Sequence, residues 1–312
     1  MHFRNSWDVH VHARLAFAVT QSSATSTGSR GTLYLVATPI GNLEDITRRA
    51  LRILKEVSAI ACEDTRHTQK LLNFYGIQNR LVSYHEHNEA ARAEELLREL
   101  ERGASLALVS DAGTPVVSDP GHRLISLCAA RGIHVVPIPG PAAALAALMA
   151  SGLPAEKFLF VGFLPARQGE RRRALTALAN FPYTLIFFEA PHRIAATLAD
   201  AAEILGLRPA VLAREITKLH EEFLRGSLAD LERRLKTSAA RGEITLVVGP
   251  PVEEPKLPSR HATLSGRVAE LISGEHLDRK AALKQAAREF GLNRRDAYKK
   301  FLIEEAGPAK RR

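Results

Sequence analysis

A regular alternation, beginning at Gly31, most constrains what this chain can fold into. Short β-branched or aromatic runs are separated by longer segments with helical periodicity, for example over 89–102 and 175–180. This alternation is typical of parallel sheets whose crossover connections are helices packed on the sheet faces. The runs predicted to be strands are 33–38, 59–62, 105–110, 134–138, 158–163, 184–188, 210–214 and 243–248. The sequence therefore predicts a two-lobed α/β fold with mostly parallel sheets.

Interruptions in this pattern divide the chain. The Ser-Gly-Leu-Pro segment at 151–154 breaks an alanine-rich helical stretch, and the proline-rich segment 250–258 ends the second α/β half. A length of 312 residues also favours more than one domain. The predicted parts are a flexible extension over 1–30, an N-terminal α/β domain over 31–150, a C-terminal α/β domain over 151–250, and a basic linker with a helical appendage over 251–312.

The basic excess of the chain is concentrated in its last part. Residues 255–312 hold 14 Lys and Arg against 7 Asp and Glu, so they carry most of the formal charge of +9. Within them, 280–290 and 294–304 are predicted to be helices, with Gly291 as the C′ residue of the first and Asn293 as the N-cap of the second. This helix-turn-helix shape favours a polyanionic partner, while a solubilising tail explains the charge equally well.

Several classes of protein are disfavoured by missing signals. The two cysteines, Cys62 and Cys128, lie in apolar runs, which favours buried thiols and a reducing cytoplasm. The longest apolar stretch, 142–149, is too short to cross a bilayer. No glycine motif for NAD or ATP occurs, and His85 and His87 lack a third ligand at diagnostic spacing. We therefore predict a cytoplasmic protein without a metal site.

Polar residues follow the predicted strands, where parallel sheets bind their ligands. Glu63, Asp64, Arg66 and His67 follow the second strand. They suit acid–base chemistry, but an equally simple interpretation is that Asp64 caps the next helix while Glu63 and Arg66 form a surface pair. The spacing alone does not separate these two interpretations.

The other strand ends also carry polar or small residues. Segments 38–47 and 110–121 are loops whose glycines and other small residues let the backbone approach a ligand. The turn 137–141 opens an alanine-rich helix, for which core packing is an equally good explanation. In the second half, 188–193 and 213–218 again place acidic and basic side chains just beyond a strand. The residues alone thus indicate a two-lobed α/β protein with a polar ligand site.

Taken together, five segments resemble the motifs of the tetrapyrrole methylase superfamily, in order and at compatible intervals over 31–249. They are Thr38-Pro-Ile-Gly-Asn-Leu, Cys62-Glu-Asp-Thr-Arg, Ser110-Asp-Ala-Gly-Thr-Pro, Pro139-Gly-Pro and Glu189-Ala-Pro-His-Arg. Within the superfamily they are most similar to the cytidine 2′-O-methyltransferases of 16S rRNA. The resemblance implies a cytoplasmic homodimer that binds S-adenosylmethionine in the cleft between its domains and acts on 16S rRNA or the small ribosomal subunit.

The same resemblance assigns provisional roles to residues. Asp64 is the first candidate for the general base, followed by Glu63 and Glu189. Ala142 stands where many relatives carry Ser, so only backbone or packing contact with the cofactor is expected there. The remaining expected cofactor contacts are Pro39, Asp111, Ala112, Gly113, Val116, Ser118, Ala143, Leu164 and Thr245, and the expected substrate contacts are Arg66, His192 and Arg193.

Two other functions remain open at this point. A tetrapyrrole or protein methyltransferase would keep the fold and change the substrate, and the basic tail together with Glu63-Asp-Thr-Arg favours RNA over these. A non-enzymatic RNA-binding or regulatory protein would use the α/β body only to sense a metabolite. Complete strand-end motifs in both halves favour an enzyme instead.

Overall fold

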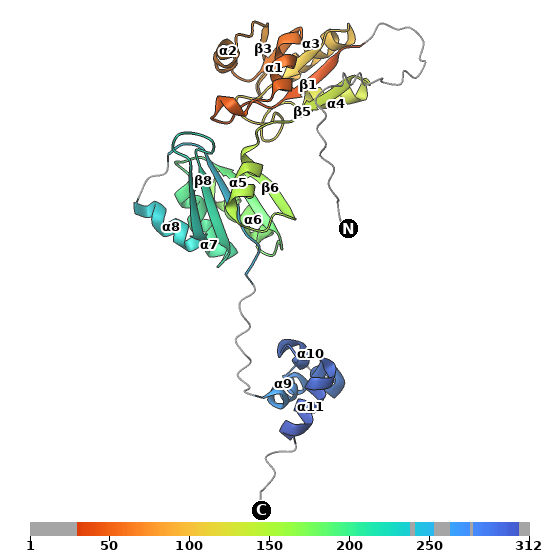
Figure 1. The fold of residues 1–312 in the computed structure, drawn as a ribbon, viewed down its shortest axis with the longest axis vertical. Helices are drawn as coiled ribbons and strands as arrows, with labels where there is room; N and C mark the ends of the chain where they lie inside the picture. The colour runs from red at the N-terminus through yellow and green to blue at the C-terminus, as the bar shows by residue number, and fades with distance from the viewer. Residues whose placement is uncertain (1–29, 238–240, 253–262, 275–276, 306–312) are drawn as a thin grey trace, which may run out of the picture. The chain divides into compact units, whose positions relative to one another are not determined.

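The computed structural model describes residues 30–237, 241–252, 263–274 and 277–305 (Figure 1). The described chain divides into two compact units. The first consists of residues 30–147 and a returning segment, Glu215–Glu222, and the second consists of Leu148–Arg214 and the described residues from Phe223 onward. Apart from Arg30, the predicted N-terminal extension lies outside the described residues, as does most of the proline-rich linker.

The first unit contains a five-stranded sheet in the order β3-β2-β4-β1-β5, and its neighbouring strands all pair in parallel. Its strands are β1 (Thr32–Val36), β2 (Ala59–Cys62), β3 (Leu81–Ser83), β4 (Leu106–Leu108) and β5 (His134–Ile138). Its helices are the 3₁₀ turn η1 (Leu43–Asp45), α1 (Arg48–Glu56), α2 (Thr65–Phe74), α3 (Glu89–Glu101) and α4 (His122–Ala130), and α5 (Ala143–Ser151) begins in this unit. The predicted parallel sheet is therefore confirmed here.

Both faces of this sheet are covered by helices. Ala59 and Ala61 of β2 belong to a core with α3 and α4, whereas Ile60 and Cys62 belong to a core with α1 and α2. Side chains of a strand point alternately to opposite faces, so a strand buried on both sides needs apolar residues throughout. This is why β2 and β4 read as continuous apolar runs. Cys62 and Cys128 are both free and buried, as predicted.

The order of strands indicates where a ligand crevice is expected. β1 and β4 are neighbours, yet β1 leads into α1 on one face and β4 leads into α4 on the other. Connections that leave adjacent parallel strands toward opposite faces open a crevice beyond their carboxyl ends, and ligands of such sheets bind there. The loops that follow β1 and β4 are the Thr38 and Ser110 motifs.

The second unit contains a mixed sheet in the order β6-β7-β10-β8-β9. β6 and β7 are parallel, but β10 lies antiparallel to both β7 and β8. This differs from the mostly parallel arrangement predicted, because every residue of β10 is buried and an apolar run reads the same in either direction. Its strands are β6 (Phe158–Phe163), β7 (Thr184–Glu189), β8 (Pro209–Arg214), β9 (Glu222–Ser227) and β10 (Ile244–Val248).

Helices α6 (Gln168–Leu178), α7 (Ile194–Leu205) and α8 (Leu228–Thr237) pack with β7, β8 and β10 in one hydrophobic core. Arg171 of α6 and Asp200 of α7 form a buried ion pair, with Nη2 and Oδ2 2.7 Å apart. Arg172 reaches the other oxygen of Asp200 at 3.0 Å. Charged groups of this unit are thus used to join its helices.

The C-terminal helices are α9 (Leu264–Gly274), α10 (Arg279–Glu289) and α11 (Arg294–Glu305). The two predicted helices are confirmed within one residue at each end, while α9 was not predicted. Gly291 has a φ of +65°, which suits the left-handed C′ position assigned to it, and Asn293 Oδ1 accepts from Asp296 N at 3.0 Å as an N-cap does. No helix in the described ranges is long and apolar enough to cross a membrane.

Candidate functional site

Backbone hydrogen bonds join the loops that follow β1 and β4. Thr38 and Gly113 form an isolated antiparallel bridge, in which each backbone N–H donates to the other carbonyl, at 2.9 and 3.1 Å. The Thr38 hydroxyl donates to Ser110 O at 3.1 Å and is buried. The two motifs that the sequence placed at separate strand ends therefore form one structure across the crevice.

The turn after β5 is attached to the same structure. Thr114 Oγ1 donates to Pro141 O at 3.1 Å. A Cβ at Gly140 would lie 3.0 Å from Ala37 Cβ, so only glycine allows this close approach without a shift. Gly113 has a φ of +84°, where a side chain would also be strained. The glycines of these motifs are thus required by the way the loops pack.

Val116 and Ser118 continue this loop with positive φ values of 76° and 69°. Non-glycine residues in the left-handed region cost conformational energy, and they persist where the surrounding structure fixes them, often at functional sites. Both residues were expected cofactor contacts. Of the other expected contacts in this unit, Pro39 and Gly113 are buried, Asp111 and Ala143 are half-buried, and Ala112 is exposed.

Asp111 connects the motif after β2 to the loop that follows β4. Asp64 N donates to Asp111 Oδ1 at 3.1 Å, while the Asp64 carboxylate accepts from Arg66 N at 2.8 Å and His67 N at 3.4 Å. Asp64 is therefore the N-cap of α2, which is the structural alternative weighed for this residue. The backbone bonds from Arg66 and His67 lower the pKa of the Asp64 carboxyl.

Glu63 has the opposite electrostatic environment. It is half-buried, and desolvation together with the nearby Asp111 raises the pKa of its carboxyl. Asp119 behaves in the same way: burial, followed by repulsion from Glu63, raises the pKa of Asp119 to about 6, against a hydrogen bond to Ser110. The fold thus brings Glu63, Asp111 and Asp119 together.

Asp119 was not among the candidates taken from the sequence. It lies in the loop 110–121, whose small residues indicate ligand contact through the backbone and give no signal for this side chain. Its position just before Pro120 and Gly121, which open α4 beside the acids of the β2 loop, could have signalled it. Only the pairing of β2 with β4 shows that these loops are neighbours.

A hollow of about 230 Å³ opens beside the β1 and β5 loops of the first unit. It is lined by Ile40, Asp45, Gly140, Pro141, Ala142, Ala146 and Thr217. Ala142 therefore borders a space that a ligand could enter, in keeping with the packing contact expected there. Thr217 comes from the returning segment Glu215–Glu222, which the sequence gave no reason to place in this unit.

The returning segment is conformationally strained. Glu215 and Thr217 have positive φ values of 51° and 67°. The Thr217 hydroxyl is buried and has no hydrogen-bond partner among the described residues. The alkyl chain of Lys218 lies where a Cβ of Gly41 would be, 2.3 Å from its Cγ, so residue 41 must be glycine. A buried polar atom left unpaired beside a hollow is suited to a polar ligand.

The acid at the strand end of the second unit is held differently. The Glu189 side chain is fully buried, and it accepts from Thr197 Oγ1 at 2.6 Å and from Ala190 N at 2.9 Å. Arg193 Nε lies 3.1 Å from its Oε1, and Arg193 also donates to Leu164 O. Glu189 and Arg193 are thus engaged in holding the turn after β7.

The remaining candidates in the second unit vary in exposure. Leu164 is 2% exposed and Thr245 is 4% exposed, and Thr245 of β10 is paired with Phe188 of β7 and Ala213 of β8. His192 is exposed, as is Arg66 in the first unit. The structure therefore gathers the candidates in two groups, one in each unit, and leaves their individual roles as predictions.

The fold and the motifs agree with comparisons to known proteins. Residues 32–232 match the family model described as Tetrapyrrole (Corrin/Porphyrin) Methylases. A protein of Micromonospora olivasterospora named ribosomal RNA small subunit methyltransferase I is 48% identical over 286 residues, which cover 89% of each chain. A protein of the same name from Halalkalibacterium halodurans is 47% identical over 282 residues, covering 89% of this chain and 97% of the relative.

Among solved structures, the chain resembles the uroporphyrin-III C-methyltransferase of Thermus thermophilus in complex with S-adenosylhomocysteine. The two have a TM-score of 0.51 and 22% sequence identity, and the match covers 70% of this chain and 97% of that one. At this identity the likeness concerns the fold alone.

Proposed function

Because the chain belongs to the tetrapyrrole methylase family and is a methyltransferase, we propose that it methylates the 2′-hydroxyl of a cytidine in 16S rRNA with S-adenosylmethionine. The substrate class is supported by relatives at 47–48% identity that are named ribosomal RNA small subunit methyltransferase I. The observation that carries the chemistry is the joining of the β1, β2, β4 and β5 loops by hydrogen bonds, with Glu63, a carboxyl of raised pKa, near the Asp111 that links two of these loops.

The residues of the first unit fit such a cofactor. The β1, β4 and β5 loops approach one another through glycines, and the hollow beside them is lined in part by Thr217. Pro39, Asp111, Gly113, Val116 and Ser118 would hold the cofactor mainly through backbone groups and packing. Leu164 and Thr245 remain proposed contacts from the second unit. When bound, S-adenosylmethionine supplies a methyl group made electrophilic by the sulfonium charge.

Glu63 is better suited than Asp64 to accept the proton of the ribose hydroxyl. As the new O–C bond forms in line with the departing sulfur, that proton must leave, and a carboxylate accepts it more readily when its pKa is closer to the working pH. Desolvation raises the pKa of Glu63, whereas hydrogen bonds to the α2 backbone lower that of Asp64. We assign the base to Glu63 and the helix cap to Asp64.

Binding the RNA requires cations near this site. Arg66 is exposed in the first turn of α2, next to the acids, so its guanidinium is available for a phosphate. In the second unit, His192 is exposed and remains a candidate contact, while Arg193 is engaged with Glu189 and Leu164 O. We therefore expect Arg66 to contribute more to RNA binding than Arg193.

The C-terminal helices are proposed to add affinity for the small subunit through charge. Deleting 255–312 should weaken binding and reduce its dependence on salt, because fewer counterions are released from the RNA. The dimeric state and the cytoplasmic location expected from the family are part of the same proposal. Unchanged affinity after the deletion would contradict the role given to this part.

The test of the function is a choice of substrates. Purified protein is incubated with radiolabelled S-adenosylmethionine and, separately, with small ribosomal subunits lacking the modification, with the free RNA of those subunits, and with uroporphyrinogen III. We expect label on the small-subunit RNA and none on the tetrapyrrole. Transfer to the tetrapyrrole alone would replace the proposed substrate while leaving the family assignment intact.

A further inference from the structure

The C-terminal helices form a core of their own. Leu264, Val268 and Leu271 of α9 pack with Ala282 and Ala286 of α10 and with Ala297 and Phe301 of α11. This core uses one face of each helix. What the opposite faces present to solvent is therefore independent of how these helices hold together.

The carboxylates of this helical part are engaged by its own fold. Glu289 pairs with Arg267 at 2.7 Å, Glu305 pairs with Arg279, and Glu304 accepts from Ser265 N at 2.7 Å. Asp278 caps α10, Glu270 pairs with Arg267, and Asp296 Oδ2 accepts from Asn293 Nδ2 at 2.6 Å. The negative charges are thus largely neutralised or fixed at helix ends.

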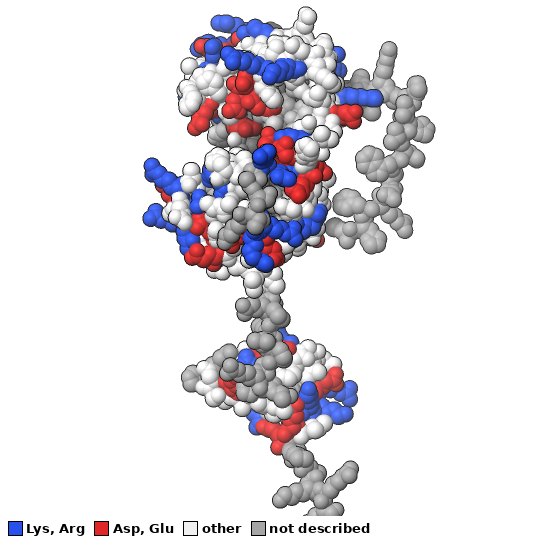
Figure 2. Space-filling model, turned by 90° about the vertical axis from the view of Figure 1, so that its left-hand side faces the viewer, with Lys and Arg blue, Asp and Glu red and all other residues white. Residues whose placement is uncertain are grey.

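The cations of α10 and α11 have no such engagement. Apart from Arg279, they are exposed and lie beyond ion-pair distance of any carboxylate in the described residues: Lys280, Lys284, Arg288, Arg294, Arg295, Lys299 and Lys300. Figure 2 shows Lys and Arg side chains along an edge of this helical part, with Asp and Glu side chains among them. The surface is consequently positive, and the partner that fits it carries negative charge.

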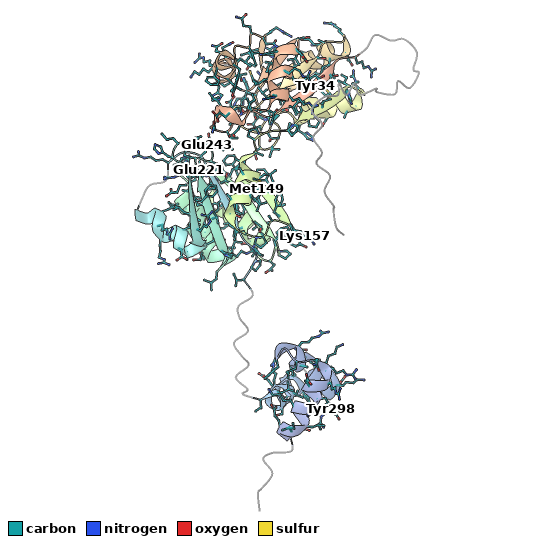
Figure 3. The ribbon with its side chains drawn as sticks, viewed as in Figure 1. Tyr34, Met149, Lys157, Glu221, Glu243 and Tyr298 are labelled. Atoms are coloured by element: carbon teal, nitrogen blue, oxygen red, sulfur yellow. The ribbon has the colours of Figure 1, made fainter. Side chains whose placement is uncertain are left out.

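One face of α11 combines these cations with exposed apolar side chains. Arg294, Tyr298 and Leu302 lie four residues apart and so form one row, and Arg295, Lys299 and Ile303 form the neighbouring row. Tyr298 is 56% exposed, and Leu302 and Ile303 are 47% and 64% exposed. Tyr298 is labelled in Figure 3 beside α11. Phe301 and Ala297 form the buried side of the helix, next to the row that begins with Arg294.

An exposed aromatic ring among cations fits unpaired nucleotides. A base stacks on an aromatic face whatever its identity, while Arg and Lys hold the flanking phosphates. A helix-turn-helix can also bind nucleic acid by inserting its second helix into a major groove. A helix cannot enter the major groove of A-form RNA in this way, because that groove is deep and narrow. The geometry favours stacking over groove reading.

We infer that the outward face of α11 binds single-stranded RNA, with a base stacked on Tyr298 and phosphates held by Arg294, Arg295 and Lys299. The inference rests on the proposed function, which makes small-subunit RNA the partner, and it adds the face and the mode of contact. Stacking does not distinguish one base from another, so this surface supplies affinity. The target cytidine is then selected at the proposed site in the first unit.

The test uses the full chain and the variants Tyr298→Ala and Tyr298→Phe. Affinity is measured by fluorescence anisotropy for a single-stranded oligouridylate and for an RNA duplex of the same length. We expect Tyr298→Ala to bind the single strand about 10-fold more weakly, Tyr298→Phe to bind it normally because the ring is kept, and the duplex to bind all three alike. Ile272→Ala, which trims an exposed apolar side chain of α9, is the matched control.

A second pair of substitutions separates charge from stacking. Arg294→Gln with Arg295→Gln should reduce the slope of log affinity against log salt by about 1.4 on single-stranded RNA, because each lost phosphate contact removes about 0.7. Tyr298→Ala should leave that slope unchanged. A Tyr298→Ala chain that keeps its helical content and binds single-stranded RNA as tightly as the unchanged chain would overturn the inference.

The outcomes also separate this inference from the proposed function. If the unchanged chain methylates small subunits while Tyr298→Ala retains its affinity for RNA and loses affinity for a ribosomal protein, α11 is a protein-docking face and the inference is wrong. If the unchanged chain transfers no methyl group to RNA but binds single strands in a Tyr298-dependent way, the proposed function is wrong and the inference stands.

Discussion

The strand-end acids of the two units have different surroundings, although both stand at the carboxyl end of a buried strand. In the first unit, Glu63 and Asp119 lie close enough to repel each other, and both have raised pKa values. In the second unit, Glu189 is fully buried and receives hydrogen bonds from Thr197 and Ala190 N, with Arg193 alongside. His85 lowers the pKa of Glu63 but does not offset burial and the nearby Asp111. An acid left with a raised pKa is suited to proton transfer, whereas an acid compensated by a cation and hydrogen bonds is suited to holding the fold together. This contrast supports the proposal that the chemistry takes place in the first unit.

The largest expected effect comes from removing the proposed base. Glu63→Gln should lower the rate of single-turnover methyl transfer by about 100-fold or more, because general-base catalysis contributes on the order of 10²–10⁴. Cofactor affinity and thermal stability should change little. The rate is measured with labelled cofactor and saturating small subunits.

Asp64→Asn is the matched comparison for that variant. Asn caps a helix about as well as Asp, so α2 should remain intact, and we expect less than about a 10-fold loss of rate. Comparable losses for the two variants would show that both neighbouring acids take part. A loss confined to Asp64→Asn would return the base to Asp64 and contradict the division drawn between the two residues.

A smaller effect is expected in the second unit, and on stability instead of rate. Thr197→Val keeps the shape of the side chain but removes the hydroxyl that donates to the buried Glu189 carboxylate at 2.6 Å. Hydrogen bonds to buried charged groups contribute about 1.5–3 kcal/mol, so the free energy of unfolding should fall by about 2 kcal/mol. Urea denaturation measures it, with exposed Thr176→Val of α6 as a control expected to change little.

The rate of methyl transfer per folded molecule tests whether Glu189 of the second unit takes part in the chemistry. The Thr197→Val enzyme should methylate small subunits at the normal rate below its unfolding temperature. A fall of 10-fold or more, without a matching change in substrate affinity, would mean that Glu189 takes part in the chemistry.

The smallest expected effect is a gain of stability at the strand ends of the first unit. In the folded chain, burial raises the pKa of Asp119 to about 6, so it holds its proton more tightly than the unfolded chain does. The wild type therefore loses stability as the pH rises from about 4 to about 6, and the loss persists above that range. Asp119→Asn should be more stable than the wild type by about 1–2 kcal/mol at pH 8, and about equally stable at pH 4.

Denaturation at the two pH values checks this prediction. A variant that is less stable at pH 8 would mean that the Asp119 carboxylate has a compensating partner, and it would weaken the contrast between the units. If the variant is more stable and also slower in methyl transfer, Asp119 belongs to the catalytic group with Glu63.

Local patterns explain what could be predicted from the sequence. The caps Asn293 and Gly291 depend on residues within one turn, and the strands β2 and β4 depend on burial of both sheet faces, so both kinds of element were located correctly. β3 and β9 were missed because β3 has three residues and β9 is only half-buried, which gives neither a clear apolar run nor a clean alternation. The antiparallel direction of β10 is likewise absent from its residue types.

The candidate site was predictable only as a set of motifs. Thr38, Asp111 and Pro141 are distant in sequence, and it is the pairing of β1 with β4 and β5 that places their loops together. Thr217 was missed because its segment returns to the first unit from the middle of the second. The proposed assignment of the general base to Glu63 depends on the finding that Asp64 accepts hydrogen bonds from the α2 backbone amides. The residue types alone do not show which of the two carboxylates does so.

The position of the methyl group on the RNA distinguishes methylation of a ribose from methylation of a base. Small-subunit RNA labelled by the protein is hydrolysed in alkali, where an unmodified 2′-hydroxyl attacks the adjacent phosphodiester and a methylated one does not. We expect the label to appear in a single alkali-resistant dinucleotide that begins with cytidine. Label released as a mononucleotide would place the methyl group on a base, and the proposed 2′-O-methylation would be wrong.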